Sequence, residues 1–170
     1  MITPAFCATL ALYNRWQNQN LTAAADGLGP QERDRGRGAF FGSIAGTLNH
    51  LLWADAVWMA RFEDVAGPGG SIAGSAWFRP DWAAFKADRL AMDARIIDWA
   101  EALDDAALAG DLRWHSGALG REVATPKALC VMHFFNHQTH HRGQVHAMLT
   151  AAGAEPGDTD LFILHQDDAP

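Results

Sequence analysis

Four long segments with a helical spacing of apolar residues dominate this sequence and leave little chain for other structure. In the first segment, Pro4–Ala25, the apolar stripe consists of Phe6, Leu10, Tyr13, Trp16 and Leu21. The other three span about Ser43–Glu63, Asp81–Leu103 and Thr125–Ala152. Four such helices joined by loops predict an all-α fold, an antiparallel four-helix bundle that forms a single domain over residues 1–170.

Capping signals mark the ends of the predicted helices. Thr3 followed by Pro4 is a favourable pair of N-cap and first helical residue, and Ser43 is a candidate cap for the second helix. Thr125 and Pro126 repeat the cap-then-proline pattern before the last helix, and Gly153 supplies its stop. The third helix is expected to start just after Pro80.

The segments between the helices are short or rich in glycine and proline. DLRWHSGALGREVAT, residues 111–125, alternates around Leu112 and Trp114, which predicts a short β-hairpin or an extended excursion before the last helix. Residues 26–38 and 65–80 are expected to form loops. The first of these contains a basic cluster, which we interpret as solvated loop rather than a phosphate clamp: Arg33, Arg35 and Arg37.

Composition excludes several classes of protein. The chain is 49% hydrophobic and 19% charged, as in globular domains. A net charge of −7 argues against binding to nucleic acid, which needs a dense basic patch. No apolar run approaches the roughly 18 residues of a membrane span, and we expect no secretory signal. Cys7 and Cys130 are far apart and are expected to act as small apolar residues in a reducing compartment, the cytoplasm.

Residues 131–149 hold five of the eight histidines: His133, His137, His140, His141 and His146. On a helix, residues four apart differ by about 40° and about 6 Å, so two imidazoles at that spacing can bind one metal ion. The pairs His133–His137 and His137–His141 both qualify, and His140 is an alternative partner for His137. All three of the regularly spaced histidines cannot share one ion, because the outer two are about 12 Å apart.

A third ligand would have to come from another helix, and His50 is the candidate. It lies among leucines in GTLNHLLWADAVW, where an isolated histidine is usually a core residue. A ready pair of imidazoles elsewhere favours ligation instead. His115 and His165 are expected at the surface. His146 lies about 140° around the helix from His141 and should face solvent or a subunit contact.

Three segments resemble the DinB family of bacterial proteins: YNRW (13–16), GTLNHLLWADAVWMARF (46–62) and HFFNHQTHHRGQVHAML (133–149). The resemblance covers nearly the whole chain, and H-x-x-x-H-R-G-Q is its most specific part. It implies a four-helix bundle in which three histidines hold a divalent metal ion, matching His50, His137 and His141 here. It thus selects His141 over His140, leaves His133 as a neighbour, and suggests a homodimer.

Three neutral imidazoles would leave a divalent ion its charge and at least one open position. Zinc or nickel suits such ligands, and a closed structural zinc site would show four protein ligands. The ion could lower the pKa of bound water toward 7, polarise a carbonyl or hold a thiolate. We therefore predict a metal-dependent enzyme that acts on a small molecule by hydrolysis or by transfer of a low-molecular-weight thiol. The alternative is a non-catalytic, stress-related bundle in which the metal is structural or sensed.

The sequence shows no clear candidate for a general base, so we assign no catalytic residues. Asp55 lies about 140° from His50 and is expected to serve packing or to face solvent. Asp111 and Glu122 could overhang the site. Side chains that could orient the ligand rings are His133, Asn136, His140 and Gln144. Arg142 could bind a substrate anion or form a salt bridge to another helix, and Tyr13 could reach the cavity or belong to the core.

Overall fold

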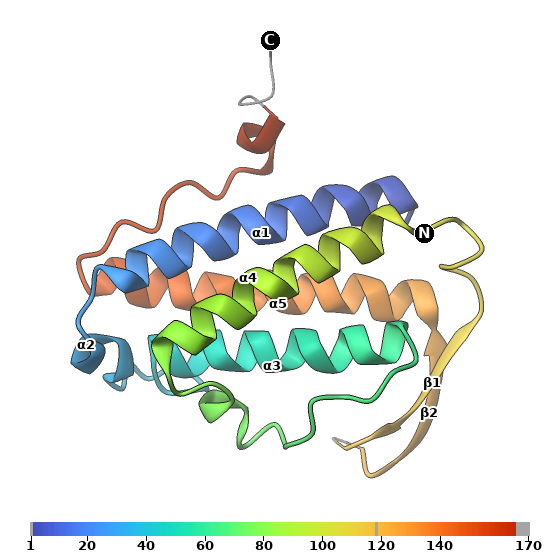
Figure 1. The fold of residues 1–170 in the computed structure, drawn as a ribbon, viewed down its shortest axis with the longest axis horizontal. Helices are drawn as coiled ribbons and strands as arrows, with labels where there is room; N and C mark the ends of the chain where they lie inside the picture. Colours follow the sequence, from blue (N-terminus) through green and yellow to red (C-terminus); the bar gives the residue numbers. More distant parts are fainter. Residues whose placement is uncertain (1, 118, 166–170) are drawn as a thin grey trace.

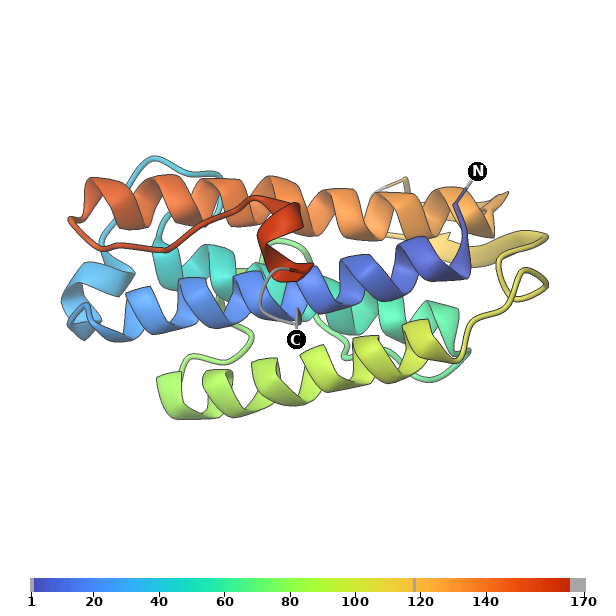
Figure 2. The same cartoon turned by 90° about the horizontal axis from the view of Figure 1, so that it is seen from above.

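Four long α-helices lie side by side in the computed structural model, which describes residues 2–117 and 119–165 (Figures 1 and 2). They are α1 (Pro4–Asp26), α3 (Ile44–Phe62), α4 (Trp82–Glu101) and α5 (Lys127–Ala151), and a short helix, α2 (Pro30–Asp34), follows α1. An antiparallel hairpin of β1 (Asp111–Ser116) and β2 (Arg121–Pro126) precedes α5. Two 3-10 turns are η1 (Ser75–Trp77) and η2 (Leu161–His165). The predicted long helices and hairpin are therefore present.

Side-chain caps start the first three long helices. The Thr3 hydroxyl accepts from the Phe6 N–H at 3.2 Å, and that of Ser43 accepts from the Gly46 N–H at 3.0 Å. Asp81 caps α4 in the same way. Each cap satisfies a backbone donor that the first helical turn leaves unpaired. The predicted caps at Thr3 and Ser43 are thus confirmed.

The start of α5 differs from the prediction. Thr125 is not the cap, because it belongs to β2, where it pairs with Leu112 of β1. Pro126 occupies the N-cap position and gives no side-chain hydrogen bond. The Lys127 N–H instead donates to the Gly110 carbonyl at 2.9 Å. The hairpin therefore runs directly into the helix and fixes where α5 begins.

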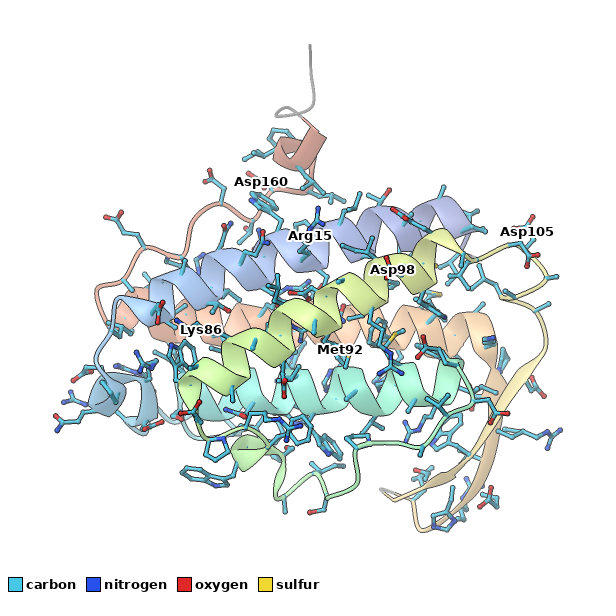
Figure 3. All side chains as sticks on the ribbon, in the orientation of Figure 1. Arg15, Lys86, Met92, Asp98, Asp105 and Asp160 are labelled. Atoms are coloured by element: carbon cyan, nitrogen blue, oxygen red, sulfur yellow. The ribbon has the colours of Figure 1, made fainter. Side chains whose placement is uncertain are left out.

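Each long helix contacts two others, so that α1, α4, α3 and α5 close a ring. The pairs α1–α4 and α3–α5 are antiparallel. Lys86 near the start of α4 accordingly pairs with Asp26 at the end of α1, 2.8 Å apart (Figure 3). The pairs α1–α5 and α3–α4 run in the same direction, because residues 64–81 return the chain along α3 (Figure 1). The predicted antiparallel order thus holds for two of the four contacts.

The loop expected at residues 26–38 contains the helix α2, which was not predicted. Arg33, on that helix, is buried, and it donates to the carbonyl oxygens of Ala25 and Leu28 at the end of α1. The interpretation of the basic cluster as solvated loop is therefore wrong for Arg33. Arg35 and Arg37 do lie beyond the helix, where both pair with Glu32.

Two apolar clusters form the core, one toward the hairpin and one toward α2. The first includes Cys7, Met59, Phe62, Ile96 and Phe134, and the second includes Leu21, Ile44, Leu48, Phe85 and Leu149. Met92, labelled in Figure 3, packs against both. Among the described helices, none has the length and apolar character of a membrane span.

Both cysteines are free and buried, as expected of small apolar residues. Burial raises the pKa of the Cys7 thiol to about 11 and also raises the pKa of Cys130. Neither thiol is ionised at neutral pH, so neither is set up as a nucleophile or metal ligand.

A layer of buried polar side chains separates the two apolar clusters. It draws on all four long helices: Asn14, Asn18, Asp55, Arg89, Asp93, Gln138 and Arg142. Arg89 donates to Asp55 at 2.7 Å and lies 2.8 Å from Asp93. Gln138 donates to the other oxygen of Asp55 at 2.9 Å, and Asn18 donates to Asp93 at 2.8 Å. The buried charges of Asp55, Arg89 and Asp93 therefore each have a partner of opposite charge, which buried charges require.

Replacing Arg89 by methionine should strongly destabilise the chain, because it leaves two buried carboxylates without their cation. We expect Arg89→Met to lower the free energy of unfolding by about 3–5 kcal/mol. Arg95→Met is the control, since Arg95 pairs with Glu63 at the surface and its loss should cost less than about 1 kcal/mol. Urea denaturation measures both values. Equal losses in the two variants would contradict a structural role for the polar layer.

Candidate metal centre

Three histidines from two helices meet at one point near the middle of the structure. His50 lies on α3, and His137 and His141 lie one turn apart on α5. Their potential ligand atoms all lie within 4.8 Å of one another. His50 and His141 are buried, and His137 is half-buried. The structure thus brings together the three residues that the family resemblance selected from those that the spacing allowed.

The cluster has the dimensions of a metal site. The Nε2 atoms of His50 and His137 are 3.2 Å apart. Two nitrogen ligands of a tetrahedral ion with bonds of about 2.0–2.1 Å are about 3.3 Å apart. The ring centre of His141 lies 4.7 Å from that of His50 and 4.4 Å from that of His137. The three rings are therefore close enough for a shared divalent ion once the His141 ring adjusts toward the other two.

Hydrogen bonds fix the tautomers of two of the three imidazoles. The Ser75 hydroxyl donates to the Ile72 carbonyl at 2.6 Å, so its oxygen accepts from Nδ1–H of His50 at 2.8 Å. Nδ1 of His141 likewise donates to the amide oxygen of Gln144 at 2.8 Å. Both rings therefore carry their proton on Nδ1, and the lone pair of Nε2 is left for a cation.

Burial keeps these imidazoles neutral. It lowers the pKa of His50 to about 3, and the neighbouring His141 lowers it further in the same direction. The pKa of His137 is also lowered to about 3, first by burial and then by the surrounding histidines. Burial lowers the pKa of His141 too. At neutral pH all three rings are therefore unprotonated, which is the form that binds metal.

Phe41 packs against the face of the His50 ring, whereas Ser75 bonds to the edge of that ring. The two rings stack with their centres 3.6 Å apart and their planes at 15°. This contact depends on Gly46 in the first turn of α3, because a Cβ there would lie 2.3 Å from the Phe41 carbonyl oxygen. A larger residue at position 46 would push Phe41 away from the histidine.

A cavity of about 770 Å³ opens onto the cluster, with His50 and His137 in its wall. Trp53 and Trp58 of α3 and Trp114 of β1 form much of its apolar lining. The segment 65–73 closes one side. A small molecule can therefore reach two of the three imidazoles.

The other histidines of α5 lie outside the cluster. His133 lines the cavity, and its ring centre is 5.7 Å from that of His137. His140 is exposed beside His141. His146 is half-buried, and its Nε2 lies 3.4 Å from the Gly157 carbonyl oxygen. His146 therefore faces solvent only in part, because its ring also contacts the segment after α5, which runs back along the helices (Figure 2).

The two remaining predictions for histidines concern the surface. His115 is exposed on the hairpin and lies 3.0 Å from Glu122, as a surface residue would. The side chain of His165 lies outside the part of the chain that the structure describes. Neither Glu122 nor Asp111 lines the cavity, so the hairpin carboxylates do not overhang the cluster.

Three further predictions concern Asp55, Arg142 and Tyr13, which lie in the polar layer or contact the C-terminal segment. Asp55 serves packing, since it is buried against Arg89. Arg142 is buried and donates to the amide oxygen of Asn14 on α1. It forms no salt bridge within the described residues, and its binding of a substrate anion stays a prediction. The Tyr13 hydroxyl donates to the Thr159 carbonyl at 2.7 Å and does not reach the metal-site cavity.

Of the side chains expected to orient the ligand rings, only Gln144 is hydrogen-bonded to one. Asn136 is exposed. Ser75 and Phe41, which do contact His50, were not predicted. Ser75 lies in residues 65–80, which were expected to form a loop, and Phe41 lies just before the second helix. Nothing in their local sequence links them to a histidine.

Acid should destabilise the metal-free chain. An unfolded histidine has a pKa of about 6.5, whereas those of His50 and His137 in the folded chain are about 3. The unfolded state therefore binds more protons between these values, and the free energy of unfolding should fall as the pH drops from about 6.5 toward 3. Denaturation at several pH values tests this. The fall should flatten in His50→Gln/His137→Gln but persist in His115→Gln, and an unchanged slope in the double variant would refute it.

Comparison with known proteins agrees with the resemblance seen in the sequence. Residues 1–169 match the DinB family, so the match covers essentially the whole chain. A search of curated proteins finds none that matches. The chain belongs to the DinB family.

Proposed function

We propose that this member of the DinB family is a four-helix bundle that binds one divalent metal ion through His50, His137 and His141. The closed ring of helix contacts supports the bundle. The potential ligand atoms of the three imidazoles lie close enough together to bind one ion, which supports the metal site. The tautomers of His50 and His141 support it as well. Zinc or nickel is the expected ion, because both accept imidazole ligands readily.

We further propose that the chain is a metal-dependent enzyme acting on a small molecule, by hydrolysis or by transfer of a low-molecular-weight thiol. The observation that carries this is the cavity at His50 and His137. When bound there, the ion would supply a Lewis acid with an open coordination position. His50 and His137 would hold it at the cavity wall, while the tryptophans exclude water from a bound substrate.

The alternative is a non-catalytic protein in which the metal clamps α3 to α5 or is sensed. The cavity favours the enzyme, because a clamp needs no access for a reactant. The two differ when the metal is removed: the clamp should lose its helical structure, whereas the enzyme should stay folded and lose turnover. We also expect the chain to form a homodimer in the cytoplasm.

Substitution of a ligand should abolish stoichiometric metal. Elemental analysis of protein purified without a tag or added metal should find one ion per chain, and about a tenth of that or less in His50→Ala and His137→Ala, because two imidazoles make a weak site. His146→Ala, outside the cluster on the same helix, is the control and should keep the ion. Full metal content in His50→Ala would remove that residue from the site.

Ser75 should strengthen metal binding through His50, because its hydroxyl fixes the ring and its tautomer. Loss of such a partner typically lowers metal affinity about 10- to 100-fold, and we expect this of Ser75→Ala in a chelator competition assay. Ser71→Ala is the matched control, since Ser71 lies in the same segment but does not contact His50. Equal affinities for the two variants would show that the hydroxyl has no such role.

Turnover can be sought with ester substrates and with thiols paired with an electrophile. Activity should appear in the metal-loaded chain and be absent from His137→Ala. A chain that retains its metal but turns over neither class of substrate would favour the structural or sensing alternative.

A further inference from the structure

The cavity that opens onto the histidine cluster also contains a cation, Arg61. It lies eleven residues after His50 on α3, which is three helical turns, so both residues share one face of the helix. Their backbones are about 16 Å apart along the helix axis. Trp58 lies between them on the same wall. On α3, the cavity wall thus has His50 at one end and the guanidinium of Arg61, three turns away, at the other.

Arg61 has no acidic partner in the part of the chain that the structure describes. Its guanidinium carbon lies 4.6 Å from the ring centre of Trp58 and 5.2 Å from that of Trp114. None of the residues that line the cavity is an aspartate or glutamate. Arginine stays charged at neutral pH, and burial lowers the pKa of this one. A positive charge that lies against apolar walls is stabilised more by an anionic ligand than by a neutral one.

We propose that Arg61 binds the carboxylate of the substrate, whose apolar body lies along Trp58 and whose reacting group lies at His50 and His137. This inference rests on the proposed function, because it assigns the substrate of the same site. Arg61 would select and position the substrate without taking part in the reaction.

The chemistry of the cavity favours a single negative charge at that end. Arg61 is the only arginine or lysine in the cavity lining, so a dianion would bring one charge into apolar surroundings without a partner. A carboxylate matches the planar guanidinium and can accept two parallel hydrogen bonds. The substrate class is therefore an elongated monocarboxylate with an apolar or aromatic middle.

Two probes of equal shape test the proposal: 4-phenylbutyrate and its uncharged amide, 4-phenylbutyramide. Isothermal titration calorimetry on the full-length, metal-loaded chain should give an affinity for the carboxylate about 10- to 100-fold above that for the amide. In Arg61→Met, which keeps the apolar stem, this preference should vanish while amide binding stays within about threefold. Arg61→Lys should keep part of the preference.

Arg113→Met is the matched control. Arg113 precedes Trp114 on β1 but is exposed and does not line the cavity, so the preference should survive its loss. Thermal unfolding of each variant identifies any that fails to fold, and Arg61→Lys then decides the question. Failure of both probes to bind, or an undiminished preference in Arg61→Met, would overturn the proposal.

Binding measured after treatment of the chain with a chelator shows whether Arg61 or the metal binds the carboxylate. The preference for carboxylate should persist after the ion is removed, and its disappearance there would show that the metal bound the carboxylate and would overturn the role of Arg61. Metal content measured in the same samples tests the proposed function independently: a wild-type chain without stoichiometric metal would refute the metal site but leave the comparison of Arg61 variants intact.

Discussion

The buried carboxylate of Asp55 ties three helices together, and the geometry of the histidine cluster depends on it. It accepts hydrogen bonds from Gln138 of α5 and from Arg89 of α4. Gln138 directly follows His137, so this contact fixes which turn of α5 faces which turn of α3. A shift of one turn, about 5.4 Å, would carry the rings of His50 and His137 beyond the reach of a common ion. Apolar side chains alone would define this register less sharply.

Much of the fold could be predicted from the sequence, because helix periodicity and caps are local signals. The capped start of α1 at Thr3 and the hairpin before α5 both follow from a few neighbouring residues. What could not be predicted depends on contacts between distant segments. The polar layer is one case, since Asp55 and Arg142 show no local sign of the helix that each will face. The parallel course of α3 and α4 is another, because it is set by the path of residues 64–81.

The candidate site likewise has features that the local sequence predicts and features that depend on contacts between distant segments. The spacing of His137 and His141 on one helix is local, and the sequence alone identified a possible pair there. The choice of His141 over His140 came from the family resemblance, and the structure agrees in placing His140 at the surface. Ser75 hydrogen-bonds to His50 across a loop, and Arg61 of α3 lies beside Trp114 of the hairpin in the cavity wall. These relations exist only in three dimensions.

X-ray absorption spectroscopy at the edge of the bound metal, on protein purified without a tag or added metal, tests the central claim most directly. If imidazole nitrogens from α3 and α5 bind one ion, the spectrum should show a shell of light scatterers at about 2.0–2.1 Å. It should also show the outer-shell pattern of three imidazoles. A sulfur shell at about 2.3 Å, or the pattern of a single imidazole, would contradict the account.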